Sequence, residues 1–194
     1  MDIFKRSEKA NPRFTELHLM IALKVIAEDG AIGRKRLTEI LGLGEGSVRT
    51  ILNKLKGESL ISSSQVGHVI SEKGRKFLER NFPKGTKIAA AELTLSKENY
   101  AVLVEGASNK IVSGLEQRDE AIKVGADCAV TLVYEGRRLR FPKRVDLKGR
   151  YGKAIEEITS KFDLKEGDVI IIGGGSNIVK AIEGALAASK AIGN

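Results

Sequence analysis

Three helical patterns follow one another along the N-terminal part of the chain. Apolar residues recur at helical spacing over residues 17–27, and Asp29-Gly30 ends this first pattern. Apolar residues then repeat at i, i+3 and i+4 over residues 37–41, and Gly42 is placed to end the second helix in a left-handed conformation. The third pattern begins after a turn of about three residues, which is the length that a helix-turn-helix uses.

The third helix is predicted over about residues 45–57, after an opening that contains Gly44 and Gly46. The apolar residues that share one face of this helix are Val48, Ile51, Leu52 and Leu55. Helical spacing therefore predicts that this face is buried against the first two helices.

A change of period follows the third helix. Residues 60–65 and 68–71 flank the turn Gln65-Val66-Gly67, which predicts a two-stranded hairpin. A closing helix is predicted over residues 75–81. Three helices, a hairpin and a closing helix make a winged helix-turn-helix, which we assign to residues 1–82.

A second domain is predicted over residues 87–194, after the Pro- and Gly-containing segment 81–87. Strands are expected at 88–95, 100–105, 128–134, 137–141 and 169–172. Helices are expected at 117–124, 151–162 and 178–191. The mixed order of strands and helices predicts an α+β sandwich, with helices packed on a sheet, so the whole chain belongs to the α+β class.

The composition is that of a globular protein, with 42% hydrophobic and 30% charged residues. A single cysteine, Cys128, cannot form an intramolecular disulfide, which favours a cytoplasmic setting. The polar, basic start lacks the apolar region of a signal peptide, and the apolar run at 17–27 is too short to span a membrane, so we expect no membrane partner. The net charge of +8, densest before residue 83, fits a polyanionic partner.

The outer face of the third helix carries side chains suited to a DNA major groove. Once the apolar face is buried, the residues expected to point outward are Ser47, Arg49, Thr50, Asn53 and Lys54. Arginine can bond guanine bidentately and asparagine can do the same with adenine, while hydroxyls reach phosphates or base edges. Gly44 and Gly46 would let the helix N-terminus approach a phosphate closely.

Further DNA contacts are expected beside the third helix. Arg34, Lys35 and Arg36 open the second helix, where it would cross the DNA backbone. His68 and Gln65 lie at the hairpin, which would touch a flanking groove or phosphate. The alternatives are a protein-interaction module, which winged helices also form, and a solvated surface. In the second case, Arg and Lys simply face solvent and His68 is an exposed hairpin residue.

A triple glycine in the second domain is a candidate ligand site. The segment Gly173-Gly174-Gly175-Ser176-Asn177 lies between a predicted strand and a helix, where a helix N-terminus can bind a small anion. It matches neither the dinucleotide-binding pattern nor the P-loop. The alternative is a tight turn in which Ser176 or Asn177 caps the helix.

A basic segment also stands out, because seven of the fourteen residues 137–150 are Lys or Arg. It could attract an anionic effector or additional DNA backbone, or it could be an ordinary half-exposed strand.

Catalytic chemistry is not expected. His18 and His68 both lie in the first domain, and neither has a second His or Cys near it in sequence to form a metal site. Adjacent acids such as Glu156 and Glu157 cannot both face one cleft from neighbouring helix positions. The sequence therefore predicts no enzyme, no cofactor and no metal.

Three stretches resemble an archaeal family of transcriptional regulators that pair an N-terminal winged helix with a C-terminal domain of unknown function. They are Leu-Gly-Glu-Gly-Ser-Val-Arg-Thr at 43–50, Arg-Asp-Glu-Ala-Ile-Lys at 118–123 and Gly-Asp-Val-Ile-Ile at 167–171. The resemblance spans about residues 15–190. It implies an archaeal, cytoplasmic regulator and supplies no catalytic residues.

Together these features predict a sequence-specific regulator that binds double-stranded DNA as a homodimer. In this interpretation the second domain dimerises or senses a small anionic effector. Two alternatives remain: a small-molecule enzyme or nucleotide-binding protein with an accessory winged helix, and a protein-interaction module.

Overall fold

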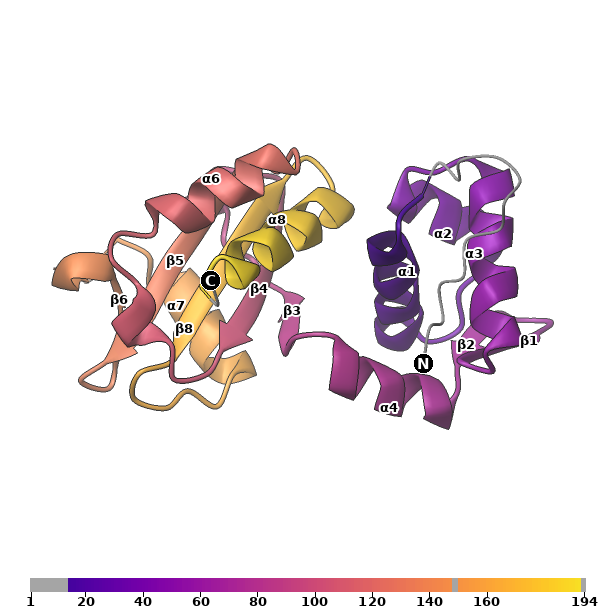
Figure 1. Ribbon diagram of the computed structural model, residues 1–194, viewed down its shortest axis with the longest axis horizontal. Coiled ribbons are helices and arrows are strands. Elements are labelled where there is room, and N and C mark those ends of the chain that lie inside the picture. Colours follow the sequence, from indigo (N-terminus) through magenta and orange to yellow (C-terminus); the bar gives the residue numbers. More distant parts are fainter. Residues whose placement is uncertain (1–13, 148–149, 193–194) are drawn as a thin grey trace. The chain divides into compact units, whose positions relative to one another are not determined.

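The computed structural model describes residues 14–147 and 150–192 of the chain. The chain divides after Phe82 into two compact units, each described here by itself (Figure 1). The polar, basic start that argued against a signal peptide lies almost wholly outside the described residues. No helix in the described part is long and apolar enough to cross a membrane.

The first unit consists of helices followed by a hairpin and a closing helix. Its elements are α1 (Glu16–Asp29), α2 (Arg34–Leu41), α3 (Glu45–Gly57), β1 (Ile61–Ser64), β2 (Gly67–Ile70) and α4 (Glu72–Asn81). The predicted core face of α3 is confirmed, because Val48, Ile51, Leu52 and Leu55 are all buried. Gly42 ends α2 with φ 63° and ψ 23°, the left-handed cap that the sequence predicts.

The hairpin is tighter than the sequence predicts. Gly67 pairs with Ser64 as part of β2, so the turn consists of Gln65 and Val66 alone. Gly67 has φ 131°, and a Cβ there would lie 2.7 Å from the carbonyl oxygen of Ile32. This close approach lets Ile32 exchange two backbone hydrogen bonds with His68, of 3.0 and 2.8 Å. The segment before α2 thus fixes the hairpin to the helices.

The second unit is built on one sheet. Its α-helices and strands are β3 (Gly85–Lys87), α5 (Ala91–Thr94), β4 (Glu98–Val104), α6 (Leu115–Lys123), β5 (Cys128–Glu135), β6 (Arg138–Phe141), β7 (Val145–Asp146), α7 (Gly152–Lys161), β8 (Val169–Gly175) and α8 (Ile178–Lys190). The described strands lie in the order β3-β4-β8-β5-β6-β7, with each neighbouring pair antiparallel.

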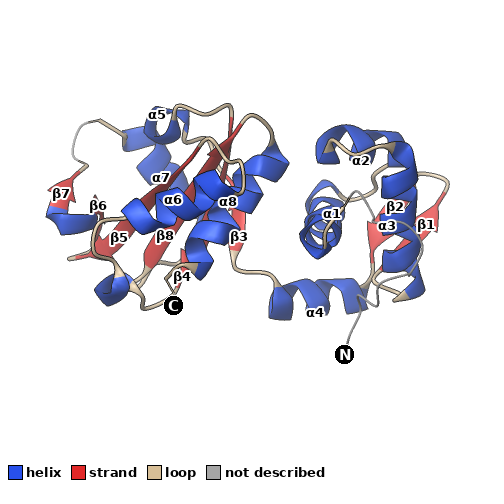
Figure 2. Cartoon of the chain, turned by 45° about the horizontal axis from the view of Figure 1, so that its top comes forward, coloured by secondary structure: helices blue, strands red, loops and turns tan. Residues whose placement is uncertain are grey.

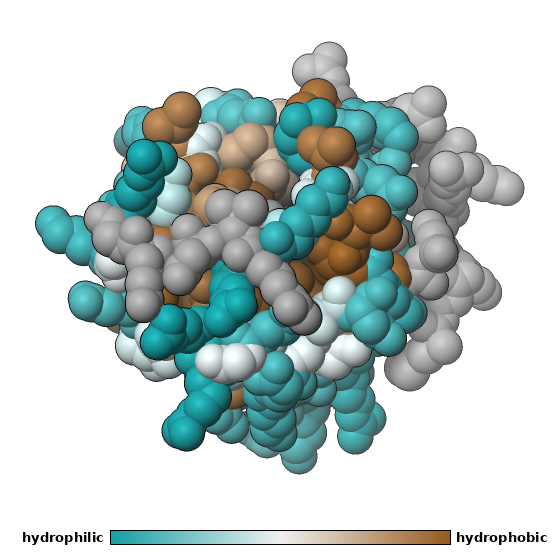
Figure 3. Space-filling model, turned by 90° about the vertical axis from the view of Figure 1, so that its left-hand side faces the viewer, coloured by the Kyte–Doolittle hydropathy of each residue, from teal (hydrophilic) through white to brown (hydrophobic). Residues whose placement is uncertain are grey.

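Helices cover both faces of this sheet (Figure 2). On one face, α8 packs against β8 and β4 and lies beside α6. On the other face, Ala154, Ile158 and Phe162 of the α7 region share a core with Leu132 and Ile170 of the sheet. The α+β class is therefore confirmed, and β8, buried along its whole length, lies at the centre. On the face that Figure 3 shows, hydrophilic side chains cover much of the surface, with apolar patches between them.

One strand prediction in this unit is wrong, and another is confirmed but too short. The predicted strand at 88–95 is instead a loop and the short helix α5, and β4 pairs with β3. The run Ala-Ala-Ala-Glu-Leu at 89–93 has high helix propensity, and a short apolar run does not distinguish a strand from a helix. The predicted strand at 169–172 extends through Gly175, for a packing reason given below.

Candidate nucleic-acid interface

The outer face of α3 is narrower than the sequence predicts. Arg49, Thr50 and Asn53 are exposed, whereas Ser47 and Lys54 are half-buried at the edge of the core face. Arg49 and Asn53 lie four positions apart and therefore project from the same side of the helix. Neither side chain forms a hydrogen bond or ion pair with any part of the chain that the structure describes, so both are available to a partner.

Two of the predicted DNA-contacting side chains on α3 are engaged within the unit. The Lys54 ammonium lies 5.9 Å from the centre of the Phe14 ring, a cation–π contact that holds it beside α1. The Thr50 hydroxyl donates a 2.9 Å hydrogen bond to the carbonyl oxygen of Gly46 in the preceding turn. Contact of either residue with DNA requires the present interaction to be given up or shared.

Lys56 belongs to the exposed face, and the sequence interpretation missed it. It lies seven positions after Arg49, which is about two helical turns, and is exposed. The same i, i+4, i+7 spacing that identified the buried face could have identified Arg49, Asn53 and Lys56 as one stripe. We call these three residues the α3 stripe.

The basic residues at the start of α2 are all exposed, as a DNA-backbone contact requires. They differ in their surroundings. Arg36 pairs with Glu39 at 3.3 Å, so its charge is partly balanced within the helix. Lys35 has no recorded ion pair within the described residues. Arg34 likewise has none, so Arg34 and Lys35 both present charges that no carboxylate of the described residues balances.

His68 lies in β2, where its backbone is bridged to Ile32 just before α2. Its Nδ1 is 2.9 Å from the Ser63 hydroxyl. Partial burial lowers the pKa of His68, and the positive charges of Lys56 and Arg34 lower it further. These three basic residues, from three separate elements, form a single positive cluster. The sequence placed Arg34 and His68 on the DNA face but gave no sign that they are neighbours, because the Ile32 bridge brings them together.

The lowered pKa of His68 predicts opposite effects of pH on folding and on DNA binding. The unfolded chain takes up a proton more readily than the folded one, so the unit should lose stability as the pH falls below about 6.5. A bound phosphate would offset the Lys56 and Arg34 charges and raise the pKa of His68. DNA affinity should therefore rise severalfold as the pH falls from about 7.5 to about 5.5.

Binding isotherms at constant ionic strength, for the wild type and for His68→Gln, would measure this effect. Glutamine keeps a polar side chain but cannot titrate in this range. An equal pH slope in both proteins would show that His68 is not at the DNA contact.

The triple glycine has a packing role in the structure. Gly173, Gly174 and Gly175 are buried in β8 and paired to β4, and Gly173 and Gly174 also pair with β5. The turn that follows is confined to Ser176 and Asn177, and the Asn177 side chain caps α8 by accepting a 3.0 Å hydrogen bond from the backbone N–H of Lys180. Binding of an anion at this helix end stays a prediction. The three glycines do not support it, because they are paired strand residues and not part of the turn.

The basic segment at 137–150 begins as a half-exposed strand, β6, which pairs with β5 and β7. In β6, Arg138 is exposed and Leu139 is buried. Arg137 occupies the preceding turn with φ 61°, and Lys143 is exposed. Residues 148–149 and the side chains of 144–146 lie outside the described part, and Arg150 beyond them is exposed.

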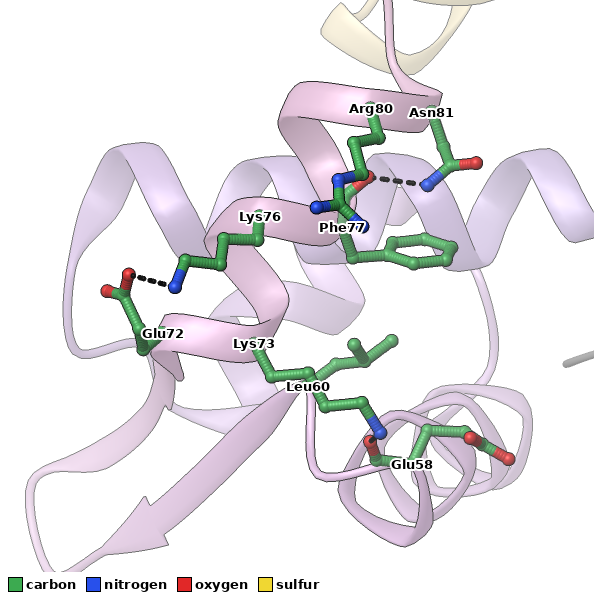
Figure 4. A pocket seen from close by; sticks show the side chains of 8 residues that line it. All are labelled: Glu58, Leu60, Glu72, Lys73, Lys76, Phe77, Arg80 and Asn81. Carbon is green, nitrogen blue, oxygen red and sulfur yellow. Dashed lines mark hydrogen bonds and ion pairs between the residues drawn. The ribbon is translucent and has the colours of Figure 1, made fainter. Parts of the chain in front are cut away.

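A surface pocket of about 710 Å³ lies beside α4, where no pattern in the sequence indicates one. Its lining residues are Glu58, Leu60, Glu72, Lys73, Lys76, Phe77, Arg80 and Asn81 (Figure 4). Lys73 donates a 2.7 Å hydrogen bond to the carbonyl oxygen of Glu58, and Lys76 pairs with Glu72 at 3.4 Å. Three of its charged side chains, those of Glu72, Lys73 and Lys76, are thus engaged locally, and we assign the pocket no ligand.

Comparisons with known proteins match both units. Residues 20–76 match the family described as PH0730-like, N-terminal domain, and residues 95–192 match the domain of unknown function DUF4443. The structure of hypothetical protein PH0730 from Pyrococcus horikoshii OT3 is similar, with 28% sequence identity, a TM-score of 0.69 and coverage of 91% of each chain. Among curated proteins, none matches. The pairing of an N-terminal helical unit with a C-terminal domain of unknown function, which the resemblance implied, is thus confirmed, and the chain belongs to the DUF4443 family.

Proposed function

We propose that the protein is an archaeal transcriptional regulator that binds specific sequences of double-stranded DNA, with α3 in the major groove. The observation that carries this proposal is the exposed α3 stripe of Arg49, Asn53 and Lys56 on the second helix of a helix-turn-helix. These side chains are the types that read guanine and adenine and contact phosphate. The second unit serves dimerisation or the sensing of a small anionic effector.

The glycines at the start of α3 support a close partner. Gly44 and Gly46 have ordinary backbone angles, and a Cβ at either position would meet nothing within 4 Å. Glycine inside a helix costs about 1 kcal/mol relative to alanine, so Gly46 reduces helix stability without serving the unit's own packing. Close approach of a DNA surface to the backbone of α3 at this point would explain why position 46 is glycine.

Glu45 changes what α3 would contact at its N-terminus. It is exposed in the first turn, where its carboxylate stabilises the helix dipole and would repel a phosphate. A carboxylate can accept a hydrogen bond from the amino group of cytosine. We therefore place base edges, and not the sugar-phosphate backbone, opposite the start of α3, whereas the positive cluster of Arg34, Lys56 and His68 faces the backbone.

The enzyme alternative has lost the feature that motivated it, because the triple glycine is explained by strand pairing and helix packing. We do not propose it further. The protein-interaction alternative is separated from the regulator by salt dependence, since phosphate contacts make nucleic-acid binding fall steeply with salt concentration.

Selection of genomic DNA fragments by the purified full chain, repeated at several salt concentrations, tests the proposal. A shared sequence motif and a steep salt dependence are the expected result. Enrichment of no motif would overturn it.

A matched pair of glycine variants sharpens this test. Gly46→Ala and Gly57→Ala both add a Cβ to α3 in open space, so both should stabilise the helix by about 0.5 to 1 kcal/mol. Gly46→Ala should also weaken binding of the selected sequence about tenfold, a loss of roughly 1.4 kcal/mol. Gly57→Ala, at the far end of the helix, should leave binding unchanged. Unchanged binding by Gly46→Ala would remove the close contact from the proposal.

A further inference from the structure

Exposed apolar side chains of the second unit gather around α6. Val112, Leu115, Ile122 and Val124 lie on this helix or directly beside it, with exposed fractions of 74%, 52%, 50% and 40%. Among the described residues, the other large apolar side chains exposed to a similar degree are Val66, on the hairpin of the first unit, and Leu95. A gathering of this kind marks an interaction surface more often than single exposed residues do.

The two apolar residues within α6 lie on its outer side. Leu115 and Ile122 are seven positions apart, or about two turns, and so share one face. Gln117 and Ala121 occupy the opposite face and are buried. Nothing in the described part of the chain covers the outer face, since Leu115 and Ile122 are each half exposed.

Two opposite charges lie midway between these apolar residues. The Arg118 guanidinium contacts Asp119 Oδ1 at 3.0 and 3.2 Å, and both side chains are about half exposed. An exposed pair between adjacent residues contributes little to the stability of the helix itself. It does place one positive and one negative group at the centre of the surface.

We propose that α6 is the contact between two copies of this chain, which pack antiparallel about a two-fold axis passing between Arg118 and Asp119. In this arrangement, Leu115 of each copy packs on Ile122 of the other, because both lie equally far from the axis. Arg118 of each copy faces Asp119 of the other, and Val112 comes near the other copy's Val124. The apolar and charged groups are therefore both self-complementary, as a two-fold interface requires.

A second copy fits the proposed function and deepens it. A single winged helix offers few base-reading side chains, and a two-fold dimer doubles them on a symmetric site. One nine-residue helix forms a small interface, so the association should be weak, with a dissociation constant of about micromolar order. The inference rests on the proposed function for its biological role, but the contact is measured without DNA.

Charge reversal provides a test that separates the contact from a folding defect. Sedimentation velocity on the full chain at about 100 µM should find a dimer for the wild type. Arg118→Asp and Asp119→Arg should each weaken dimerisation at least tenfold, because like charges then meet twice across the axis. An equal mixture of these two variants should form a heterodimer, and the double variant should dimerise again. Neither restoration would occur if the single variants were misfolded.

Leu95→Asp is the matched control. Leu95 is 92% exposed in the same unit, and its φ of 60° is one that aspartate tolerates. It should dimerise like the wild type. A wild type that is monomeric at the highest concentration, single variants that dimerise normally, or a mixture that stays monomeric would each overturn the α6 contact.

DNA binding is measured separately on the same proteins. A monomer that still selects a DNA motif would refute the α6 contact and leave the proposed function standing. A dimer that depends on α6 but selects no DNA motif would support the α6 contact and refute the proposed function.

Discussion

Gly173→Ala is expected to lower the free energy of unfolding of the second unit by at least about 3 kcal/mol. A Cβ at this position would lie 2.5 Å from the backbone nitrogen of Ala185, and closer still to the carbonyl oxygen of Ala181. Both atoms belong to the backbone of α8, which packs directly on β8. Neither can move without shifting the helix away from the centre of the sheet, so the unit loses packing along the whole contact.

The neighbouring position supplies a graded comparison. A Cβ at Gly174 would meet the side chains of Ser96 and Cys128, at 2.5 and 2.8 Å from their oxygen and sulfur atoms. Side chains can rotate where a helix backbone cannot, so Gly174→Ala should cost less than Gly173→Ala. Urea denaturation of the two variants, followed by circular dichroism, would measure the difference. A loss below about 1 kcal/mol for Gly173→Ala would contradict the packing role.

The role of Gly173 also shows why the sequence alone left two interpretations of the triple glycine open. Glycines between a strand and a helix occur both in phosphate-binding turns and in tight turns with a capped helix, and the local pattern does not distinguish the two. What decides their role is a contact with Ala181 and Ala185 on a helix that follows, formed only when α8 folds back over β8. Local periodicity, by contrast, was sufficient for α3, because all four residues of its predicted core face are buried.

The candidate site was also predictable only in part: exposure was predicted, but contacts between distant residues were not. Helical spacing correctly placed Arg49 and Asn53 on the outside of α3. It did not show that Lys54 would turn toward Phe14, because that contact depends on where the residue before α1 packs. Nor did it reveal that Arg34, Lys56 and His68 form one cluster, since their approach requires the backbone bridge between Ile32 and His68.

Arg49→Ala is expected to weaken binding of the selected DNA sequence by about 1 to 3 kcal/mol, or about five- to 150-fold, and to relax the preference at one base pair. The side chain is exposed and unpaired within the described part of the chain, so its removal should leave stability unchanged. Arg49→Lys keeps the positive charge but loses the bidentate geometry that recognises guanine. It should therefore lose the sequence preference while keeping most of the affinity for random duplex.

Lys35→Ala is the comparison that distinguishes base reading from general attraction. Lys35 is exposed in the first turn of α2 and does not belong to the α3 stripe. Its loss should weaken cognate and random duplexes alike and reduce the slope of log affinity against log salt by about one. If Arg49→Ala instead weakened both duplexes equally, Arg49 would be a phosphate contact like Lys35, and the base-reading role of α3 would have to rest on Asn53.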